Sequence, residues 1–125
     1  MYLRRSHQGF TVVELIVVVV VIAILAGIVI LAYGSWRDSV SETAVKSDLQ
    51  GVATAMDVES NATEGGFPLS LPNSFTPSDS VNLTYISGSG SEYCIQGVSA
   101  VRSSILWHVE KTNTKKAVVA KGACP

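Results

Sequence analysis

Residues 9–36, GFTVVELIVVVVVIAILAGIVILAYGSW, decide how the rest of the chain can fold. This stretch holds one charged residue, Glu14, and residues 15–36 hold none. As an α-helix with a rise of ~1.5 Å per residue, residues 15–36 would extend over roughly 33 Å, enough to cross a hydrocarbon core of ~30 Å. Its β-branched residues are poor helix formers in water. In lipid, however, the backbone must satisfy its own hydrogen bonds, so a helix is predicted.

The rest of the chain has the composition of a soluble domain. Of all 125 residues 47% are hydrophobic, yet residues 35–125 hold only 35 apolar residues out of 91. The net charge is −1, and without residues 1–9 it is −3, from 7 basic and 10 acidic residues. This mild acidity gives no electrostatic reason to bind nucleic acid broadly. The length also excludes a multi-domain enzyme. We expect one segment that is apolar enough to span a membrane, joined to one small water-soluble part.

Three interpretations compete for the apolar segment. A cleaved secretory signal peptide has a shorter apolar region, roughly 7–15 residues, although Ala32 and Gly34 imitate its cleavage site. Arg4-Arg5 suggests a twin-arginine signal, but Ser-His-Gln-Gly follows the pair. A permanent transmembrane anchor fits the length. None of the three explains Glu14, because a carboxylate at mid-membrane costs about 2.5–3.5 kcal/mol on insertion scales unless it lies near the interface and reaches water.

The wider motif accounts for this carboxylate. Residues 9–15, GFTVVEL, lie between a short basic leader and an apolar run, and they resemble the N-terminus of a type IV prepilin. The spacing is specific, with glycine, then phenylalanine, then glutamate at the fifth position of the cleaved chain. The resemblance covers residues 1–34 by motif and the remainder only by layout. It departs from many members at Leu31, where they carry a proline.

The resemblance implies a sequence of events. A prepilin peptidase would cut between Gly9 and Phe10, and the new N-terminus at Phe10 would be N-methylated. Glu14 would then pair with the Phe10 ammonium of a neighbouring subunit, which makes both of them assembly residues. The implied partners are further copies of this chain and other pilins. The implied location is the inner membrane, with a single pass, followed by an extracellular pilus on the cell surface.

The resemblance also implies four regions. These are a leader peptide (1–9), a transmembrane and assembly helix (10–36), an amphipathic helix half (37–64) and a β-sheet head with one disulfide (65–125). A type II secretion pseudopilin and a membrane-anchored extracytoplasmic binding module remain alternatives to a type IV pilus subunit.

Apolar periodicity predicts the elements of the soluble part. One helix face is marked by residues that step by 4, 3 and 4, namely Val45, Leu49, Val52 and Met56. Alternation predicts four short strands, at Val81–Ile86, at Glu92–Val98, around Ile105, Trp107 and Val109, and at Ala117–Ala120. Polar turns are expected at Ser87–Ser91 and Lys111–Lys116. The predicted fold class is α+β, in which a long N-terminal helix packs on a small antiparallel sheet of three or four strands. The resemblance implies that this is the type IV pilin fold.

The only two cysteines are Cys94 and Cys124. In a chain with an export-type N-terminus, such a pair predicts one disulfide. It would close a 31-residue loop and stabilise the fold by roughly 3–4 kcal/mol in the chain-entropy model. Two free thiols or a redox pair are the alternatives, although no CxxC spacing is present.

The head shows no catalytic pattern. His108 has no partner arrangement for nucleophilic catalysis, so no enzymatic activity is expected. No metal or cofactor motif appears, and Asp79 and Glu92 are too scattered for a calcium loop. A cluster of lysines near the last hairpin has two interpretations. It could contact DNA, an anionic cell surface or an acidic patch on the next subunit, or it could be a solvated hairpin that protects a sheet edge. Its members are Lys111, Lys115, Lys116 and Lys121.

Overall fold

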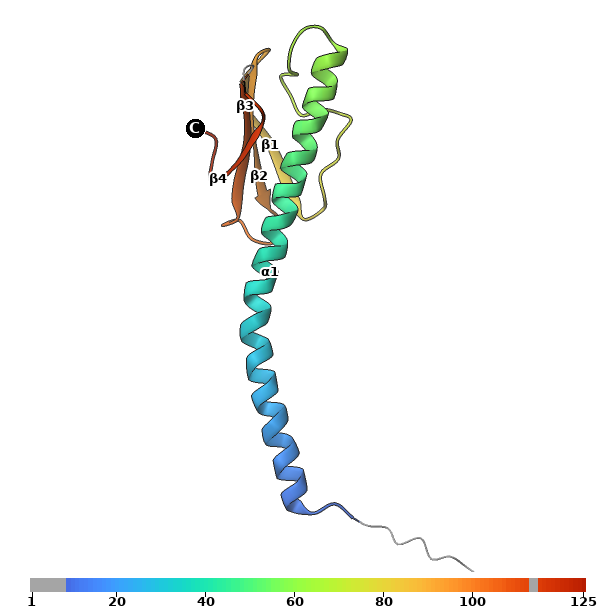
Figure 1. The fold of residues 1–125 in the computed structure, drawn as a ribbon, viewed down its shortest axis with the longest axis vertical. Helices are drawn as coiled ribbons and strands as arrows, with labels where there is room; N and C mark the ends of the chain where they lie inside the picture. The colour runs from blue at the N-terminus through green and yellow to red at the C-terminus, as the bar shows by residue number, and fades with distance from the viewer. Residues whose placement is uncertain (1–8, 113–114) are drawn as a thin grey trace, which may run out of the picture. The chain divides into compact units, whose positions relative to one another are not determined.

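The computed structural model describes residues 9–112 and 115–125, and it has one helix and one sheet. In chain order the elements are α1 (Val12–Ala62), β1 (Val81–Ser89), β2 (Glu92–Ser99), β3 (Leu106–Thr112) and β4 (Val118–Lys121) (Figure 1). The chain divides into two compact units, with the division after Trp36. The predicted α+β fold, a long N-terminal helix and a four-stranded antiparallel sheet, is confirmed.

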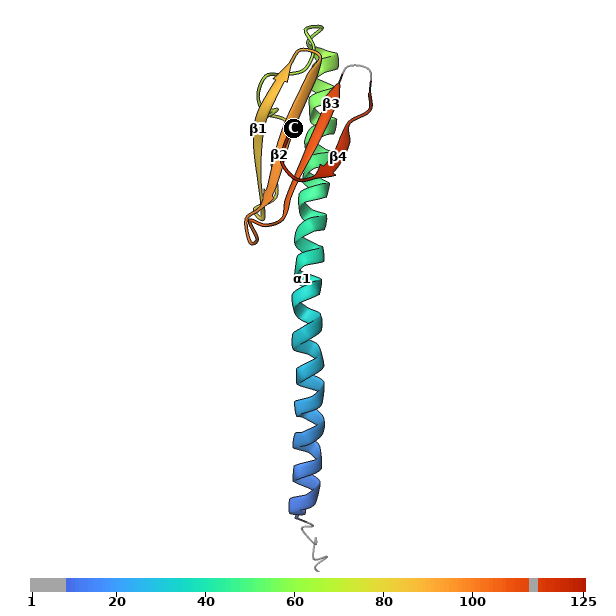
Figure 2. The same ribbon diagram turned by 90° about the vertical axis from the view of Figure 1, so that its left-hand side faces the viewer.

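The strands lie side by side in sequence order, β1-β2-β3-β4, and every neighbouring pair is antiparallel (Figure 2). Two expected turns are shorter than predicted. β1 continues to Ser89, because the ladder resumes after an irregularity between Tyr85 and Ser87 and pairs Ser89 with Glu92. At the next turn, Lys111 and Thr112 belong to β3 and pair with β2. Backbone pairing here overrides the weak strand preference of polar and glycine residues.

The core lies between the sheet and residues 45–56 of α1. The predicted helix face is confirmed, since its four side chains are all completely buried: Val45, Leu49, Val52 and Met56. They pack against Ile95 of β2 and Val109 of β3, which are paired in the sheet and also completely buried. Gly97 lets the helix approach, because a Cβ at this position would lie 3.1–3.2 Å from Val45, Leu49 and Leu83.

The segment between α1 and β1 is fastened to the helix by side chains. The buried Asp48 carboxylate accepts hydrogen bonds from the Ser78 backbone N–H at 2.8 Å and from its hydroxyl at 2.9 Å. Farther along α1, Phe75 covers Gly51 so closely that a Cβ there would meet its ring. The Ser74 hydroxyl donates to Glu59 at 2.9 Å. This proline-containing segment is therefore an integral layer over the head.

Candidate assembly site at the start of the helix

The helix begins with a reciprocal pair of hydrogen bonds between Thr11 and Glu14. The Thr11 backbone N–H donates to Glu14 Oε2 at 2.9 Å, and the Glu14 backbone N–H donates to the Thr11 hydroxyl oxygen at 3.2 Å. The Thr11 hydroxyl also donates to Oε2, at 3.1 Å. This is a capping box, in which side chains satisfy two backbone donors that have no partner within the helix. Glu14 therefore stabilises the first turn, and as an anion it also suits the positive end of the helix dipole.

The capping role of Thr11 was not predicted from the sequence, although a signal for it was present. A Ser or Thr followed three positions later by Glu or Gln, just before an apolar run, is typical of a capping box. The hydrogen bonds described for the Glu14 carboxylate all end on Oε2. Its other oxygen, Oε1, is thus the atom available to a further donor.

Phe10 and Gly9 lie just before the helix, in an open stretch of backbone. Phe10 is 91% exposed, and nothing lies within 4 Å of a Cβ built on Gly9. A peptide bond between an exposed glycine and an exposed residue is accessible to an enzyme. The basic leader residues Arg4 and Arg5 lie outside the described residues.

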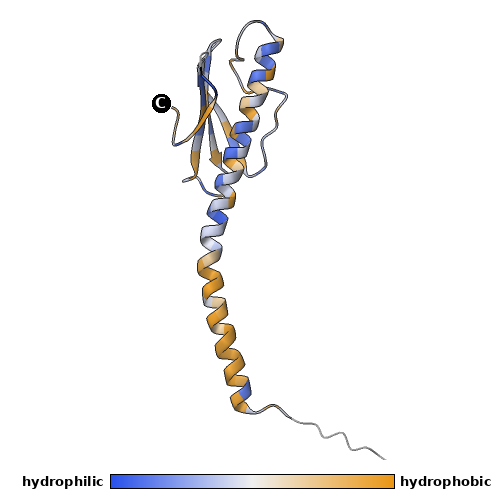
Figure 3. Ribbon diagram, viewed as in Figure 1, coloured by the Kyte–Doolittle hydropathy of each residue, from blue (hydrophilic) through white to orange (hydrophobic). Residues whose placement is uncertain are grey.

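Between Glu14 and Ala32, α1 is apolar on all sides (Figure 3). Every large hydrophobic side chain from Val12 to Leu31 is about half or more exposed. By length and composition, α1 is the one helix in the described part of the chain that could cross a membrane. A helix that is apolar all round needs lipid or neighbouring helices to cover it.

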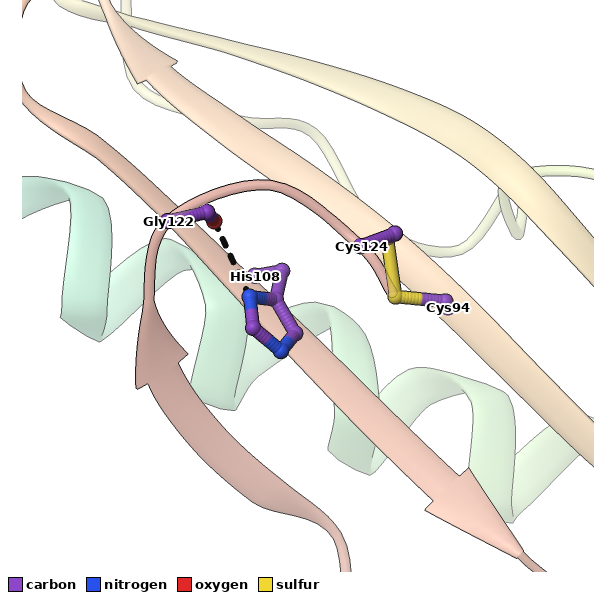
Figure 4. Close-up of a disulfide and its surroundings, with 4 residues drawn as sticks. All are labelled: Cys94, His108, Gly122 and Cys124. Carbon is purple, nitrogen blue, oxygen red and sulfur yellow. Dashed lines mark hydrogen bonds between the residues drawn. A yellow bond between two sulfur atoms is a disulfide. The ribbon is translucent and has the colours of Figure 1, made fainter.

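In the head, the predicted disulfide is present between Cys94 on β2 and Cys124. Figure 4 shows the adjacent segment after β4, which turns at Gly122 and returns to the sheet. Gly122 adopts a φ of 106°, which favours glycine. Its carbonyl oxygen lies 2.9 Å from Nδ1 of His108, whose side chain is 8% exposed. His108 therefore has a structural partner in the chain terminus.

The four lysines do not form one uniform patch. Lys111 is 18% exposed, and its ammonium lies 2.5 Å from the Asp57 carboxylate. It also lies 5.1 Å from the centre of the Phe67 ring. Lys115, Lys116 and Lys121 are exposed. Only these three are available to a partner, and Lys111 belongs to the packing of the head. Within the described residues, no three His, Cys, Asp or Glu side chains are grouped to hold a metal ion.

Comparison with known proteins agrees with the N-terminal geometry. Residues 4–30 match the family described as "Prokaryotic N-terminal methylation motif". The chain therefore carries a prokaryotic N-terminal methylation motif. The match covers the exposed Gly9-Phe10 bond, the Thr11–Glu14 capping box and most of the apolar half of α1, up to residue 30.

Three curated proteins are similar to this chain. The "Type II secretion system core protein G" of Pseudomonas aeruginosa is 40% identical over 55 residues, which are 44% of this chain and 39% of that protein. The "Type IV major alpha-pilin" of Moraxella bovis is 33% identical over 80 residues, 64% of this chain and 49% of that protein. The "Type IV wide pilus major component PilA4" of Thermus thermophilus is 27% identical over 97% of this chain and 99% of its own length. The chain thus spans less than half the length of the first two.

Proposed function

We propose that this protein is a structural subunit of a type IV pilus or a pilus-like filament. In this proposal a prepilin peptidase cuts after Gly9, Phe10 becomes the methylated N-terminus, and the apolar helix half polymerises with copies of itself and with other pilins. The observation that carries the proposal is the exposed Gly9-Phe10 bond beside Glu14, at the start of a helix that is apolar on all sides. The soluble head and its disulfide suit an extracytoplasmic surface.

Cleavage would change the electrostatics of the N-terminus. It removes the two basic residues Arg4 and Arg5 and creates an α-ammonium at Phe10. Two opposite charges in a water-poor bundle of helices attract strongly, and each relieves the cost of burying the other. Because Thr11 occupies Oε2 of Glu14, Oε1 is the atom that we assign to the Phe10 ammonium of a neighbouring subunit. Such a contact would set the register between subunits.

The first test is the mass of the exported protein and of its N-terminal peptide. A chain that starts at Phe10 with one added methyl group supports the proposal. A chain that starts at Ser35 would indicate a conventional signal peptide, and one that keeps Met1 would indicate a permanent anchor. Either of these two results would overturn it.

The second test separates the charge of Glu14 from its capping role. Glu14→Gln keeps a side-chain acceptor for the Thr11 N–H but carries no charge, whereas Glu14→Ala loses both. We expect cleavage to persist in both variants and filament yield to fall in both. Thr11→Val keeps the charge and removes the hydroxyl, so it should assemble better than Glu14→Gln. Normal filament yield from Glu14→Ala would refute the proposed ion pair.

A type II secretion pseudopilin is a second candidate. It is favoured by the 40% identity with core protein G, although that similarity covers only 55 residues. The similarity over nearly the whole chain is to a pilus component. Electron microscopy of sheared surface material, labelled with antibody against this chain, distinguishes the two. Long labelled surface filaments support a pilus subunit, and labelled fibres confined to the periplasm support the pseudopilin.

A further inference from the structure

Two large aromatic side chains lie near the end of the apolar run. Tyr33 and Trp36 are three positions apart on α1, and their ring centres are 5.9 Å apart with an angle of 37° between the planes. They are 54% and 61% exposed. Each side chain joins a broad apolar ring to one polar group, a hydroxyl or an indole N–H. Such side chains are enriched where the lipid headgroups meet the hydrocarbon.

Their distance from Glu14 matches the thickness of a membrane. Between Glu14 and Arg37 the sequence has no charged residue. Tyr33 lies 19 residues after Glu14 and Trp36 lies 22 residues after it. At a rise of ~1.5 Å per residue these separations are about 29 and 33 Å, close to the ~30 Å of a hydrocarbon core.

Because the basic pair Arg4 and Arg5 before the apolar run favours the cytoplasmic side, we infer that Tyr33 and Trp36 bind the outer headgroup boundary of the lipid bilayer, while Glu14 lies at the opposite boundary. The inference deepens the proposed function, because it rests on a membrane stage before assembly and specifies the depth of the helix at that stage. It also explains how the helix carries a carboxylate. Glu14, already held by Thr11, stays within reach of water and does not enter the hydrocarbon.

The same spacing has a consequence for assembly. A helix held by a carboxylate at one boundary and by two aromatic rings at the other resists sliding along the membrane normal. To leave the membrane, the subunit must withdraw the two rings from the headgroups and carry Glu14 into the hydrocarbon. A partner charge that meets Glu14 on the way, such as a neighbouring α-ammonium, lowers the cost of that movement.

Fluorescence quenching measures the depth directly. The chain has two tryptophans, so Trp107→Phe leaves Trp36 as the single emitter. The full chain is reconstituted in vesicles of phosphatidylcholine and phosphatidylglycerol that carry a nitroxide either on the headgroup or at the middle of the acyl chain. We expect the headgroup nitroxide to quench Trp36 about twofold more strongly than the mid-chain nitroxide.

A matched variant reports the middle of the helix. Ile24→Trp, combined with Trp36→Phe and Trp107→Phe, places the only emitter about halfway between Glu14 and Tyr33. Its preference should be the reverse, with stronger quenching by the mid-chain label. When the lipid acyl chains are lengthened from 14 to 22 carbons, an anchored Trp36 should keep its preference for the headgroup label. A preference that falls with each increment of thickness would overturn the anchoring role.

The remaining outcomes separate this inference from the proposed function. Deep quenching of both emitters would overturn the anchor and leave the membrane span intact. If Trp36 is insensitive to both labels while the mid-helix emitter of the matched variant is quenched at depth, another copy covers the rings, which also overturns the anchor. If neither emitter is quenched by either label, the helix does not enter the bilayer. That result would overturn the membrane stage and, with it, both proposals.

Discussion

The Lys111 ammonium lies 2.5 Å from Oδ1 of Asp57 and thereby joins β3 to α1. The same ammonium lies over the Phe67 ring, which packs edge-on against Tyr93 with ring centres 5.0 Å apart. One lysine therefore connects a strand, the helix and the segment that follows the helix. This arrangement explains why the Lys111 side chain is largely buried while the lysines nearby are exposed.

Removing this ammonium should destabilise the head. We expect Lys111→Met to lower the free energy of unfolding by about 1 kcal/mol, the sum of a partly buried ion pair and a cation–π contact. Lys115→Met is the matched control, because Lys115 is exposed, and it should change stability by less than about 0.5 kcal/mol. Urea denaturation in detergent measures both. Equal effects would mean that the Lys111 pair contributes nothing.

The Asp48–Ser78 contact should contribute more to the free energy of unfolding than the Lys111–Asp57 pair, because it is more buried. Asp48→Ala leaves the Ser78 N–H without its acceptor and should cost about 2 kcal/mol. Asp48→Asn keeps one acceptor oxygen and should recover part of that loss. Limited proteolysis should also cut the segment 63–80 faster in Asp48→Ala. An unchanged cleavage rate would contradict the idea that Asp48 fastens this segment.

A side chain at Gly97 should strain the packing of the helix on the sheet. A Cβ at this position would lie 3.1–3.2 Å from side-chain atoms of Val45, Leu49 and Leu83, so Gly97→Ala requires these side chains to shift by a few tenths of an ångström. We expect a loss of about 1–3 kcal/mol, as for other overpacked cores. Gln96→Ala, one residue earlier and on the opposite face of β2, is the control and should be nearly neutral. Thermal unfolding that ranks the two variants in the reverse order would show that the helix can shift freely.

Tyr93 should make the head sensitive to alkali. Burial, with a smaller contribution from the nearby Asp57 carboxylate, raises the pKa of Tyr93 above its usual value. The folded state therefore keeps the phenol proton at a pH where the unfolded chain, titrating near 10, loses it. This stabilisation is complete below about pH 10 and is lost above it, by up to about 1.4 kcal/mol per pH unit.

Tyr93→Phe isolates this effect. In the described part of the chain the Tyr93 hydroxyl is buried without a hydrogen-bond partner, so its removal should leave stability at pH 7 unchanged or raise it by up to about 1 kcal/mol. Between pH 9.5 and 11 the variant should lose less stability than the wild type. Denaturation curves at several pH values test this, and parallel losses in the two proteins would exclude Tyr93 as the cause.

Of the interactions considered, the disulfide should make the largest contribution to the stability of the head. Replacing both Cys94 and Cys124 with alanine should lower stability by roughly 3–4 kcal/mol, because the unfolded chain regains the freedom of the closed loop. Reduction of the wild-type protein should cause a similar loss and should have no effect on the double variant. A double variant as stable as the oxidised wild type would mean that the fold of the head does not need the bond.

Much of the fold was predictable because its determinants are periodic. Val45, Leu49, Val52 and Met56 follow the helical period, and all four are completely buried. Val81, Leu83 and Tyr85 follow the strand period and all face the core. The ends of the turns were less predictable. Residues such as Ser87, Gly88 and Lys111 have weak preferences of their own, and the neighbouring strand decides whether they extend it.

The candidate site was only partly predictable. Glu14 stood out because a carboxylate is rare in an apolar run, and the Thr11 capping box could have been found from its three-residue spacing. The position of Lys111 could not. Its partner Asp57 lies 54 residues away in the sequence, and no local pattern distinguishes it from Lys115.

By itself, the sequence determined the apolar helix half, the alternation of the strands, the motif around Gly9, Phe10 and Glu14, and the one pairing open to two cysteines. These features depend on neighbours a few residues apart or on composition. Only the tertiary structure decided that Asp48 holds Ser78, that Gly97 admits the helix and that Lys111 is paired rather than free. The physical reason is that each of these contacts joins segments far apart in the chain, and their distance depends on how the helix packs on the sheet.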